Sequence, residues 1–153
     1  MKNIVSILLI TAALITVGPA SAESSDADAR ALFTRFIAAQ NAHDANEVKS
    51  LLWDSPGMLF FSRGVETRGA AAVADRFKQY YDGTWHLEPD MSKFKTATIS
   101  ADVVQILVPI VFTRGLPGAT PQSDTFLISQ TYVKGNDGWH VASILPIANT
   151  QFK

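Results

Sequence analysis

Two hydrophobic periodicities follow one another along the chain, and their order constrains the fold more than any other feature of the sequence. Between residues 26 and 82 apolar side chains recur mainly at helical spacing, whereas from residue 84 onward they alternate as in strands. In the segment 103–113 every even position from Val104 to Phe112 is apolar, which is the strongest strand pattern in the chain. Helices followed by a run of strands indicate an α+β fold and not alternating βαβ units.

Three helices are predicted in the first half of the chain. The first starts near Asp26 and the second at Asp44, where Glu47 three places later completes a capping-box pattern. A short hairpin at 58–67 separates the second helix from the third, which covers about 70–82. The helices therefore come first, with only one hairpin between them.

The second half is predicted to form antiparallel sheet. The segments 84–89 and 94–99 read as one bent strand interrupted near Pro89, because proline cannot donate a hydrogen bond to a central ladder. For the same reason Pro109 predicts a bulge within 103–113. Two further strands, joined by a tight turn, are expected at 124–134 and 139–148.

Composition excludes several function classes. The chain has no cysteine, so disulfides, a thiol nucleophile and zinc-thiolate sites are excluded. Its formal net charge is −1, which gives no field to gather nucleic acid or anionic lipid. No histidine lies at metal-ligand spacing from another ligand on one helix, and no phosphate loop or dinucleotide fingerprint is present. We therefore expect no metal and no cofactor.

The N-terminal segment predicts export. Lys2 precedes an apolar run that Gly18 and Pro19 end, and Ala20-Ser21-Ala22 offers a small-residue cleavage site. The run is too short for an uncleaved membrane span. We expect residues 1–22 to be a cleaved signal peptide and residues 23–153 to be one domain, periplasmic or secreted, with no membrane association after cleavage.

Short motifs lie on or beside the predicted helices and at the start of the last strand. They are Asn41-Ala42-His43-Asp44, Leu51-Leu52-Trp53-Asp54, Arg68-Gly69, Val73 with Phe77, and Gly138-Trp139. Their order, which spans nearly all of residues 23–153, resembles that of the SnoaL-like and ketosteroid-isomerase-like branches of the nuclear-transport-factor-two-like superfamily.

The resemblance implies a strongly curved antiparallel sheet wrapped around the helices, a cone-shaped, cystatin-like roll with an apolar pocket at its open end. It also implies a homodimer formed through the sheet. Because members of such families include enzymes, ligand-binding proteins and assembly domains, the fold leaves function open. The first interpretation is binding of a small hydrophobic ligand. The alternatives are a cofactor-independent lyase, isomerase, cyclase or dehydratase, and an assembly or adaptor domain without a ligand.

Two residues are candidates for catalysis. Asp54 matches the acidic position that the resemblance places at the pocket mouth, where a carboxylate can act as general base. His86 is a candidate partner for it on the strand that follows the third helix. Against this role, Asp54 also suits the start of a turn at 54–57. The first helix carries no tyrosine, and no acid lies inside the late strands, so an oxyanion donor of the steroid-isomerase type is missing.

Candidate pocket residues are mostly aromatic. Gln130 stands among apolar residues on an alternating strand and is expected to point a hydrogen-bonding group into the cavity or toward a dimer partner. Arg63 and Arg68 flank the first hairpin, where either could bind a carboxylate or simply be solvated. The predicted ligand-binding residues are Phe36, Trp53, Phe60, Tyr80, Trp85, Phe112 and Gln130.

Overall fold

A computed structural model describes residues 20–148, with side chains described from Ser25 onward. The three predicted helices are present: α1 (Ala20–Asn41), α2 (Ala45–Leu51) and α3 (Ala70–Tyr80). Asp44 caps α2 as predicted, since its carboxylate accepts hydrogen bonds from the backbone N–H groups of Asn46 and Glu47. The predicted signal peptide, residues 1–22, lies almost wholly outside the described residues, and its cleavage stays a prediction.

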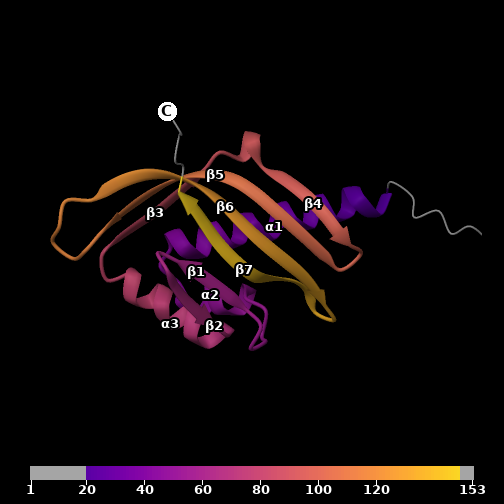
Figure 1. Cartoon of the computed structure of the whole chain (residues 1–153), viewed down its shortest axis with the longest axis horizontal. Coiled ribbons are helices and arrows are strands. Elements are labelled where there is room, and N and C mark those ends of the chain that lie inside the picture. Colours follow the sequence, from indigo (N-terminus) through magenta and orange to yellow (C-terminus); the bar gives the residue numbers. More distant parts are fainter. Residues whose placement is uncertain (1–19, 149–153) are drawn as a thin grey trace, which may run out of the picture.

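The strands form one seven-stranded sheet (Figure 1). The spatial order is β2-β1-β7-β6-β5-β3, and β4 pairs with the same edge of β5 as β3 does. A short 3-10 turn, η1 (Met91–Lys93), connects β3 to β4, which confirms the predicted interruption after Pro89. The strands are β1 (Leu59–Ser62), β2 (Val65–Arg68), β3 (Thr84–Pro89), β4 (Lys95–Ser100), β5 (Val103–Gly115), β6 (Gln122–Gly135) and β7 (Gly138–Ala148).

The sheet is mixed, so the prediction of a strongly curved, wholly antiparallel sheet is wrong in two respects. β1 runs parallel to β7, because the chain leaving α2 already pairs Leu52 with Val141 in parallel and continues in that direction. The sheet is also not strongly curled. The β5–β6 register runs through twelve pairs without a bulge, and bulges are the usual means of bending strands sharply.

Pro109 does not mark a bulge, contrary to the prediction. It stays in register opposite Leu127 on β6. On the other edge of β5, β3 pairs from Ile110 onward and β4 pairs up to Leu107. Pro109 therefore faces the gap between two partner strands, where its carbonyl accepts the Asp90 N–H at 2.9 Å, and the N–H that proline lacks is not needed for pairing.

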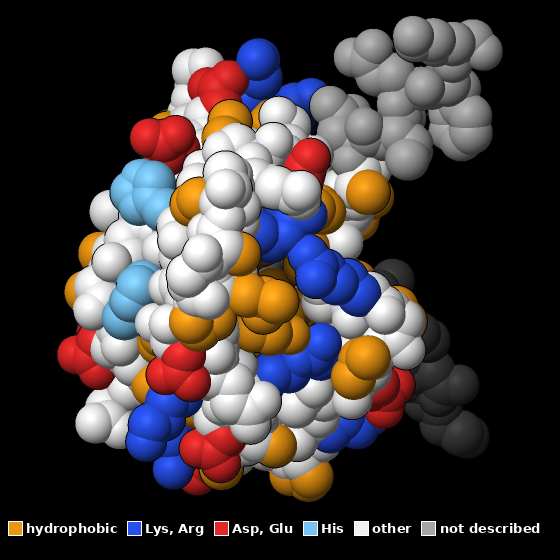
Figure 2. Space-filling view, turned by 90° about the vertical axis from the view of Figure 1, so that its left-hand side faces the viewer, with side chains coloured by type: hydrophobic (Ala, Val, Ile, Leu, Met, Phe, Trp, Pro, Cys, Tyr) orange, Lys and Arg blue, Asp and Glu red, His pale blue; other side chains and the backbone are white. Residues whose placement is uncertain are grey.

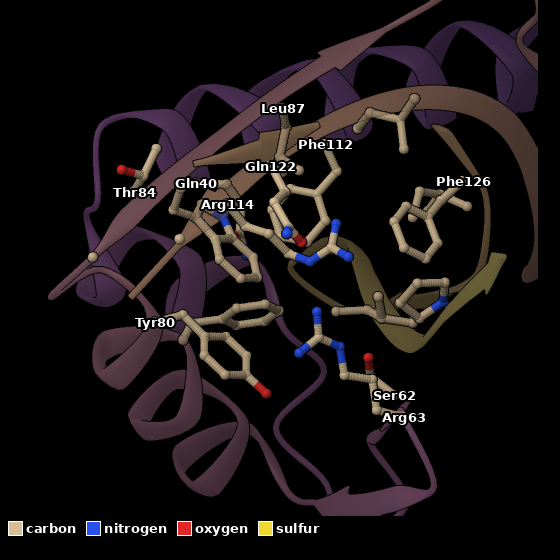
Figure 3. A pocket seen from close by; sticks show the side chains of 18 of the residues that line it. Gln40, Ser62, Arg63, Tyr80, Thr84, Leu87, Phe112, Arg114, Gln122 and Phe126 are labelled. Atoms are coloured by element: carbon tan, nitrogen blue, oxygen red, sulfur yellow. The ribbon is translucent and has the colours of Figure 1, made fainter. Parts of the chain in front are cut away.

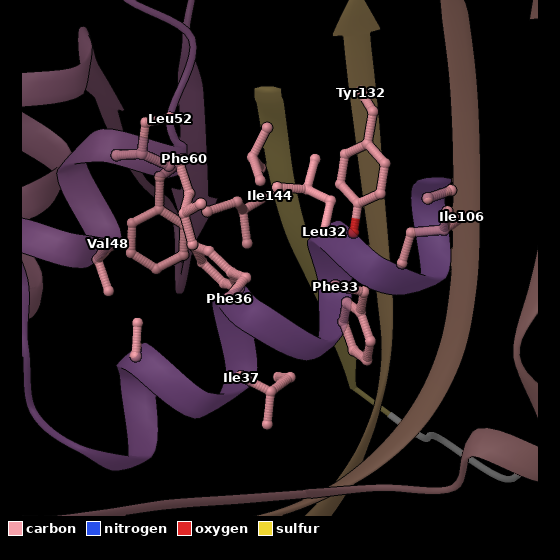
Figure 4. Close-up of a cluster of buried hydrophobic side chains, with 14 of the residues drawn as sticks. Leu32, Phe33, Phe36, Ile37, Val48, Leu52, Phe60, Ile106, Tyr132 and Ile144 are labelled. Atoms are coloured by element: carbon pink, nitrogen blue, oxygen red, sulfur yellow. The ribbon is translucent and has the colours of Figure 1, made fainter. Parts of the chain in front are cut away.

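The core lies between α1 and the inner face of the sheet (Figure 4). The even positions of β5 from Val104 to Ile110 are all buried, as the alternation predicted. We call the region around Leu32, Phe33, Phe94 and Tyr132 the closed end, since these side chains are at most 5% exposed. The one polar side-chain group among these four residues, the Tyr132 hydroxyl, donates to Gln130 Oε1 at 2.7 Å.

Polar contacts fix α1 on the sheet at both ends of the core. Near the closed end, Asp26 accepts hydrogen bonds from the Thr96 hydroxyl at 2.7 Å and from Arg30 Nε at 2.9 Å. At the other end, the Asn41 amide donates to the Leu87 carbonyl at 2.9 Å and accepts from the Leu87 N–H at 2.8 Å. None of the described helices is long and apolar enough to cross a membrane.

Candidate functional site

A cavity of about 580 Å³ opens beyond the C-terminal half of α1. We call this region the open end. Its walls come from α1, α3, the β1–β2 hairpin, the inner faces of β3 and β5 to β7, and the loop 116–120. The volume falls within the range of about 300–1,000 Å³ that is typical of small-molecule sites. Figure 2 faces this end of the molecule, where hydrophobic side chains lie between groups of Lys and Arg.

Aromatic rings make up much of the cavity wall. Trp85 stacks on Tyr80 with ring centroids 4.9 Å apart, and Phe112 meets Trp85 edge-on at 4.4 Å. Phe60 stacks on Phe77 at 4.9 Å. Such pairs favour offset-stacked and edge-to-face geometry, which leaves flat apolar surfaces facing the cavity. Six of the seven predicted ligand-binding residues line it: Phe36, Phe60, Tyr80, Trp85, Phe112 and Gln130.

Trp53, the seventh, does not line the cavity. Its side chain is 36% exposed, whereas the preceding Leu52 is 2% exposed and belongs to the core. The Trp53 backbone N–H donates to the Val141 carbonyl at 2.9 Å, which fixes neighbouring side chains on opposite sides of the chain. The indole lies against Gly57, where an added Cβ would be 3.0 Å from it.

Asp54 is exposed and lies outside the cavity lining, so its expected placement at the pocket mouth is wrong. Its carboxylate makes no hydrogen bond or ion pair with the described residues either. The turn role expected of it is taken by Ser55, whose hydroxyl accepts the Gly57 N–H at 3.1 Å and whose carbonyl accepts the Met58 N–H at 3.1 Å. Because the chain has just left the sheet after Trp53, Asp54 points away from the interior.

His86 does not join Asp54. It is exposed, and its Nε2 lies 3.5 Å from Glu88 Oε1 on the same strand. Trp85 and Leu87, its neighbours on β3, line the cavity, and strand alternation places His86 on the opposite face. Within residues 25–148 no three His, Asp or Glu side chains gather in an arrangement that could hold a metal ion.

Gln40 is a site residue that the sequence analysis missed. It is 1% exposed, and its Oε1 accepts hydrogen bonds from Trp85 Nε1 at 2.9 Å and from the Tyr81 hydroxyl at 3.0 Å. The indole N–H can only donate, which fixes the amide orientation and leaves Nε2 on the other side. That nitrogen is buried without a partner. Burial raises the pKa of Tyr81, so its hydroxyl stays a protonated donor.

A signal for Gln40 was present in the sequence. It follows Phe33, Phe36 and Ile37 at helical spacing and so shares their buried face. A glutamine on such a face needs hydrogen-bond partners or a ligand. Gln130, which the sequence analysis did identify, lines the cavity and is 1% exposed, with its Oε1 accepting from Tyr132.

Two arginines lie at the cavity mouth (Figure 3). Arg63 sits in the β1–β2 turn and makes no ion pair with a described residue. Arg114, on β5, donates from Nη2 to Asp124 Oδ2 at 2.7 Å, while its Nη1 is buried without a hydrogen-bond partner. Arg68, the other arginine named from the sequence, pairs with Glu66 and is not in the lining.

The described lining contains no aspartate, glutamate, histidine or lysine. Its ionisable groups are the two guanidiniums and the Tyr80 phenol, which accepts a hydrogen bond from Arg76 Nε at 2.6 Å. The described lining therefore combines apolar walls with positive charge, and it contains no carboxylate or imidazole that could act as a general base.

Comparison with known proteins shows similarity at the level of structure. No family model and no curated protein sequence matches the chain. An NTF2-like superfamily protein from Salmonella enterica serovar Typhimurium superimposes with a TM-score of 0.76 at 16% identity, covering 86% of this chain and 96% of that one. An NTF-2 like protein of unknown function from Shewanella oneidensis gives a TM-score of 0.64 at 14% identity, covering 80% and 98%.

A third similar structure is a domain of unknown function with a cystatin-like fold from Nostoc punctiforme. It gives a TM-score of 0.64 at 19% identity and covers 84% of this chain and 80% of its own. Identities this low establish common architecture and leave activity open. With its three helices, mixed sheet and element order, the chain has the fold of the nuclear transport factor 2-like superfamily.

Proposed function

We propose that this protein binds a small apolar molecule in the cavity at the open end, without catalysing a reaction. The observation that carries the proposal is a cavity of about 580 Å³ with walls of aromatic side chains and only a few polar groups. This combination is typical of ligand sites, in which apolar area supplies affinity and a few polar groups fix orientation.

The alternative of a cofactor-independent lyase or isomerase receives no support from the geometry. Its general base would be Asp54, which is exposed and outside the lining, and its partner His86 faces away from the cavity. An assembly domain whose interior is filled by its own side chains is also disfavoured, because the interior at this end is open.

Calorimetric titration with neutral aromatic probes tests the proposal. Naphthol and biphenyl should each form a one-to-one complex with the protein, with a negative heat-capacity change from burial of apolar surface. Quenching of Trp85 fluorescence should accompany binding, since this indole lines the cavity. Failure of both probes to bind would contradict the proposed function.

A cavity-filling variant localises the binding. Ile128 lines the cavity from β6 and is only partly buried, so Ile128→Trp should fill space and weaken probe binding by about ten-fold or more. The matched control is Lys134→Trp, on the same strand at an exposed position outside the lining. Equal affinities in the two variants would place the probe elsewhere and refute the assignment of the site.

We also propose that the mature protein is exported and forms a homodimer through its sheet. Support for the dimer comes from the sheet face opposite the helices (Figure 1). On it Val111 is 38% and Ile147 48% exposed, and Leu127 pairs between Pro109 and Ile147. Sedimentation equilibrium should give twice the chain mass, and Leu127→Glu should give the monomer. A monomeric wild-type protein would contradict the proposal.

A further inference from the structure

The open end differs from an ordinary apolar pocket in the charge at its mouth. Arg63 and Arg114 line it, and Figure 3 shows their guanidinium groups directed toward each other across the opening. The only carboxylate paired with either of them among the described residues is that of Asp124, on Arg114. These two guanidiniums and Asp124 leave about one positive charge unbalanced, and Arg76, which donates to the Tyr80 hydroxyl and the Ser62 carbonyl, pairs with no described carboxylate.

Two aromatic rings and an ion pair hold the Arg114 guanidinium in place at the mouth. Its guanidinium lies 5.1 Å from the centroid of the Phe112 ring and 5.2 Å from that of Phe126. Asp124 holds Nη2, while Nη1 is buried and has no hydrogen-bond partner. A buried N–H group without a partner costs free energy, and an anionic acceptor at the mouth would remove that cost. Arginine binds carboxylates through geometry of this kind.

Arg63 occupies a backbone position that arginine does not favour. Its φ is 54° and that of Gly64 is 76°, and the two form the turn between Ser62 and Val65, which are paired. This left-handed turn favours Asn or Gly at the first position. An arginine there carries a local conformational cost, yet it directs a second guanidinium to the mouth.

The deep end of the cavity supplies a different polar group. Gln40 lines the cavity and is 1% exposed, and its Nε2 has no hydrogen-bond partner. Its Oε1 already accepts from Trp85 and Tyr81, so the group left for a ligand is a donor. Trp85, which donates to Gln40, meets Phe112 edge-on at 4.4 Å, and the Phe112 ring centroid lies 5.1 Å from the Arg114 guanidinium. Apolar rings therefore connect this donor to Arg114.

We propose that the cavity selects an apolar monocarboxylate, with the carboxylate between Arg63 and Arg114, a flat body against Trp85 and Phe112, and a hydrogen-bond acceptor at its far end toward Gln40. This inference rests on the proposed function and specifies the ligand class. A monocarboxylate suits this mouth better than a dianionic phosphate ester does, since the second charge of the ester would lie near the Asp124 carboxylate that already pairs with Arg114.

The test compares two probes of the same shape. One is a hydroxynaphthoate with its carboxylate and hydroxyl at opposite ends of the ring system, and the other is the matching hydroxynaphthamide, which is neutral. The wild-type protein should bind the naphthoate about ten-fold or more tightly than the amide. Added salt should weaken binding of the naphthoate and leave that of the amide unchanged, because salt screens the partly exposed charges.

Variants assign the preference to residues. Arg63→Gln and Arg114→Gln should each reduce the preference for the naphthoate to about three-fold or less, and leave affinity for the amide nearly unchanged. The control is Arg68→Gln, in the same hairpin but outside the lining, which should keep the full preference. Removing the hydroxyl from the naphthoate should weaken its binding to the wild-type protein several-fold. The same change of probe should have little effect on binding to Gln40→Met.

The outcomes separate this inference from the proposed function. If the amide binds as tightly as the naphthoate and Ile128→Trp weakens both, the inference is wrong and the apolar site stands. If neither probe binds, the proposed function fails with it. Because Arg63 is exposed in a turn, its replacement does not endanger folding, and the inference can be tested even if Arg114→Gln is unstable.

Discussion

The closed and open ends of the interior use the same helix and the same strands, yet one is packed and the other hollow. At the closed end the facing positions of β5 hold aliphatic side chains such as Val104 and Ile106, both at most 1% exposed. Further along the same face, β5 carries Phe112 and Arg114, which are only partly buried. The alternation is the same in both regions. The difference shows that a strand pattern determines which face is inside, while the size and charge of the side chains determine whether that inside is filled.

The largest loss of stability is expected when a buried ring is removed from the closed end. Phe33 is fully buried beside Phe94, with ring centroids 5.5 Å apart, so Phe33→Ala should lower the free energy of unfolding by about 3–5 kcal/mol. Phe112→Ala should cost clearly less, because the Phe112 ring already faces the cavity. Urea unfolding of both variants measures the difference, and equal losses would show that the two ends are packed alike.

A smaller loss of stability is expected when the Gln40 amide of the open end is replaced. Gln40→Leu removes the acceptor for Trp85 Nε1 and the Tyr81 hydroxyl, and should cost about 1–3 kcal/mol because two partly buried donors lose their partner. Gln79→Leu is the control, since Gln79 is exposed at the mouth and its change should stay within about 0.5 kcal/mol. A loss below that limit for Gln40→Leu would mean that these bonds do not stabilise the site.

The smallest loss of stability is expected when Asp26, which fixes α1 near the closed end, is replaced. A hydrogen bond from Thr96, together with the Arg30 guanidinium, lowers the pKa of Asp26 below its ordinary value of 3.8. Because the pKa is lower in the folded state, this carboxylate stabilises the fold fully at pH values above its ordinary pKa. The stabilisation is lost as the pH falls through the pKa of the folded state. Asp26 is 40% exposed, so Asp26→Asn should cost less than about 1 kcal/mol at pH ~7.

The same variant has a pH signature. The difference in unfolding free energy between wild-type protein and Asp26→Asn should shrink as the pH is lowered below about 4 and disappear once the wild-type carboxyl is protonated. Thermal unfolding at several pH values measures it. Asp75→Asn, on the exposed side of α3, should show a smaller difference than Asp26→Asn at pH ~7. A difference for Asp26→Asn that does not change with pH would contradict the assignment to this carboxylate.

Much of the fold could be predicted from the sequence because periodicity reports burial directly. The helices and the long strands β5, β6 and β7 follow from spacing alone. The direction of β1 does not, because alternation is the same in parallel and antiparallel strands. The fate of Pro109 could not be predicted either, since it depends on a gap between β3 and β4 that arises only when three strands meet.

The site was predicted less completely, and the reasons are local. Leu52 and Trp53 are adjacent apolar residues, and the sequence does not show which one turns inward. Arg114 was missed, although its spacing of two from Phe112 places both on one face of β5. Gln40 shares a helix face with Phe36 and Ile37, but its partners Trp85 and Tyr81 come from segments that only the fold brings to it. Spacing indicates the face on which a residue lies, and it does not show which residues that face meets.

The pairing between β1 and β7 is short. β1 meets β7 at only two register pairs, compared with ten between β6 and β7, whereas Arg76 ties α3 to the β1–β2 hairpin through Thr67 and the Ser62 and Val65 carbonyls. Helix and hairpin are thus tied to each other, while the hairpin meets the rest of the sheet along this short seam. Local opening has the lowest free energy where few bonds must break, so amide protons of the seam should exchange with solvent before those of β5 and β6, and the proposed ligand could enter without unfolding of the sheet.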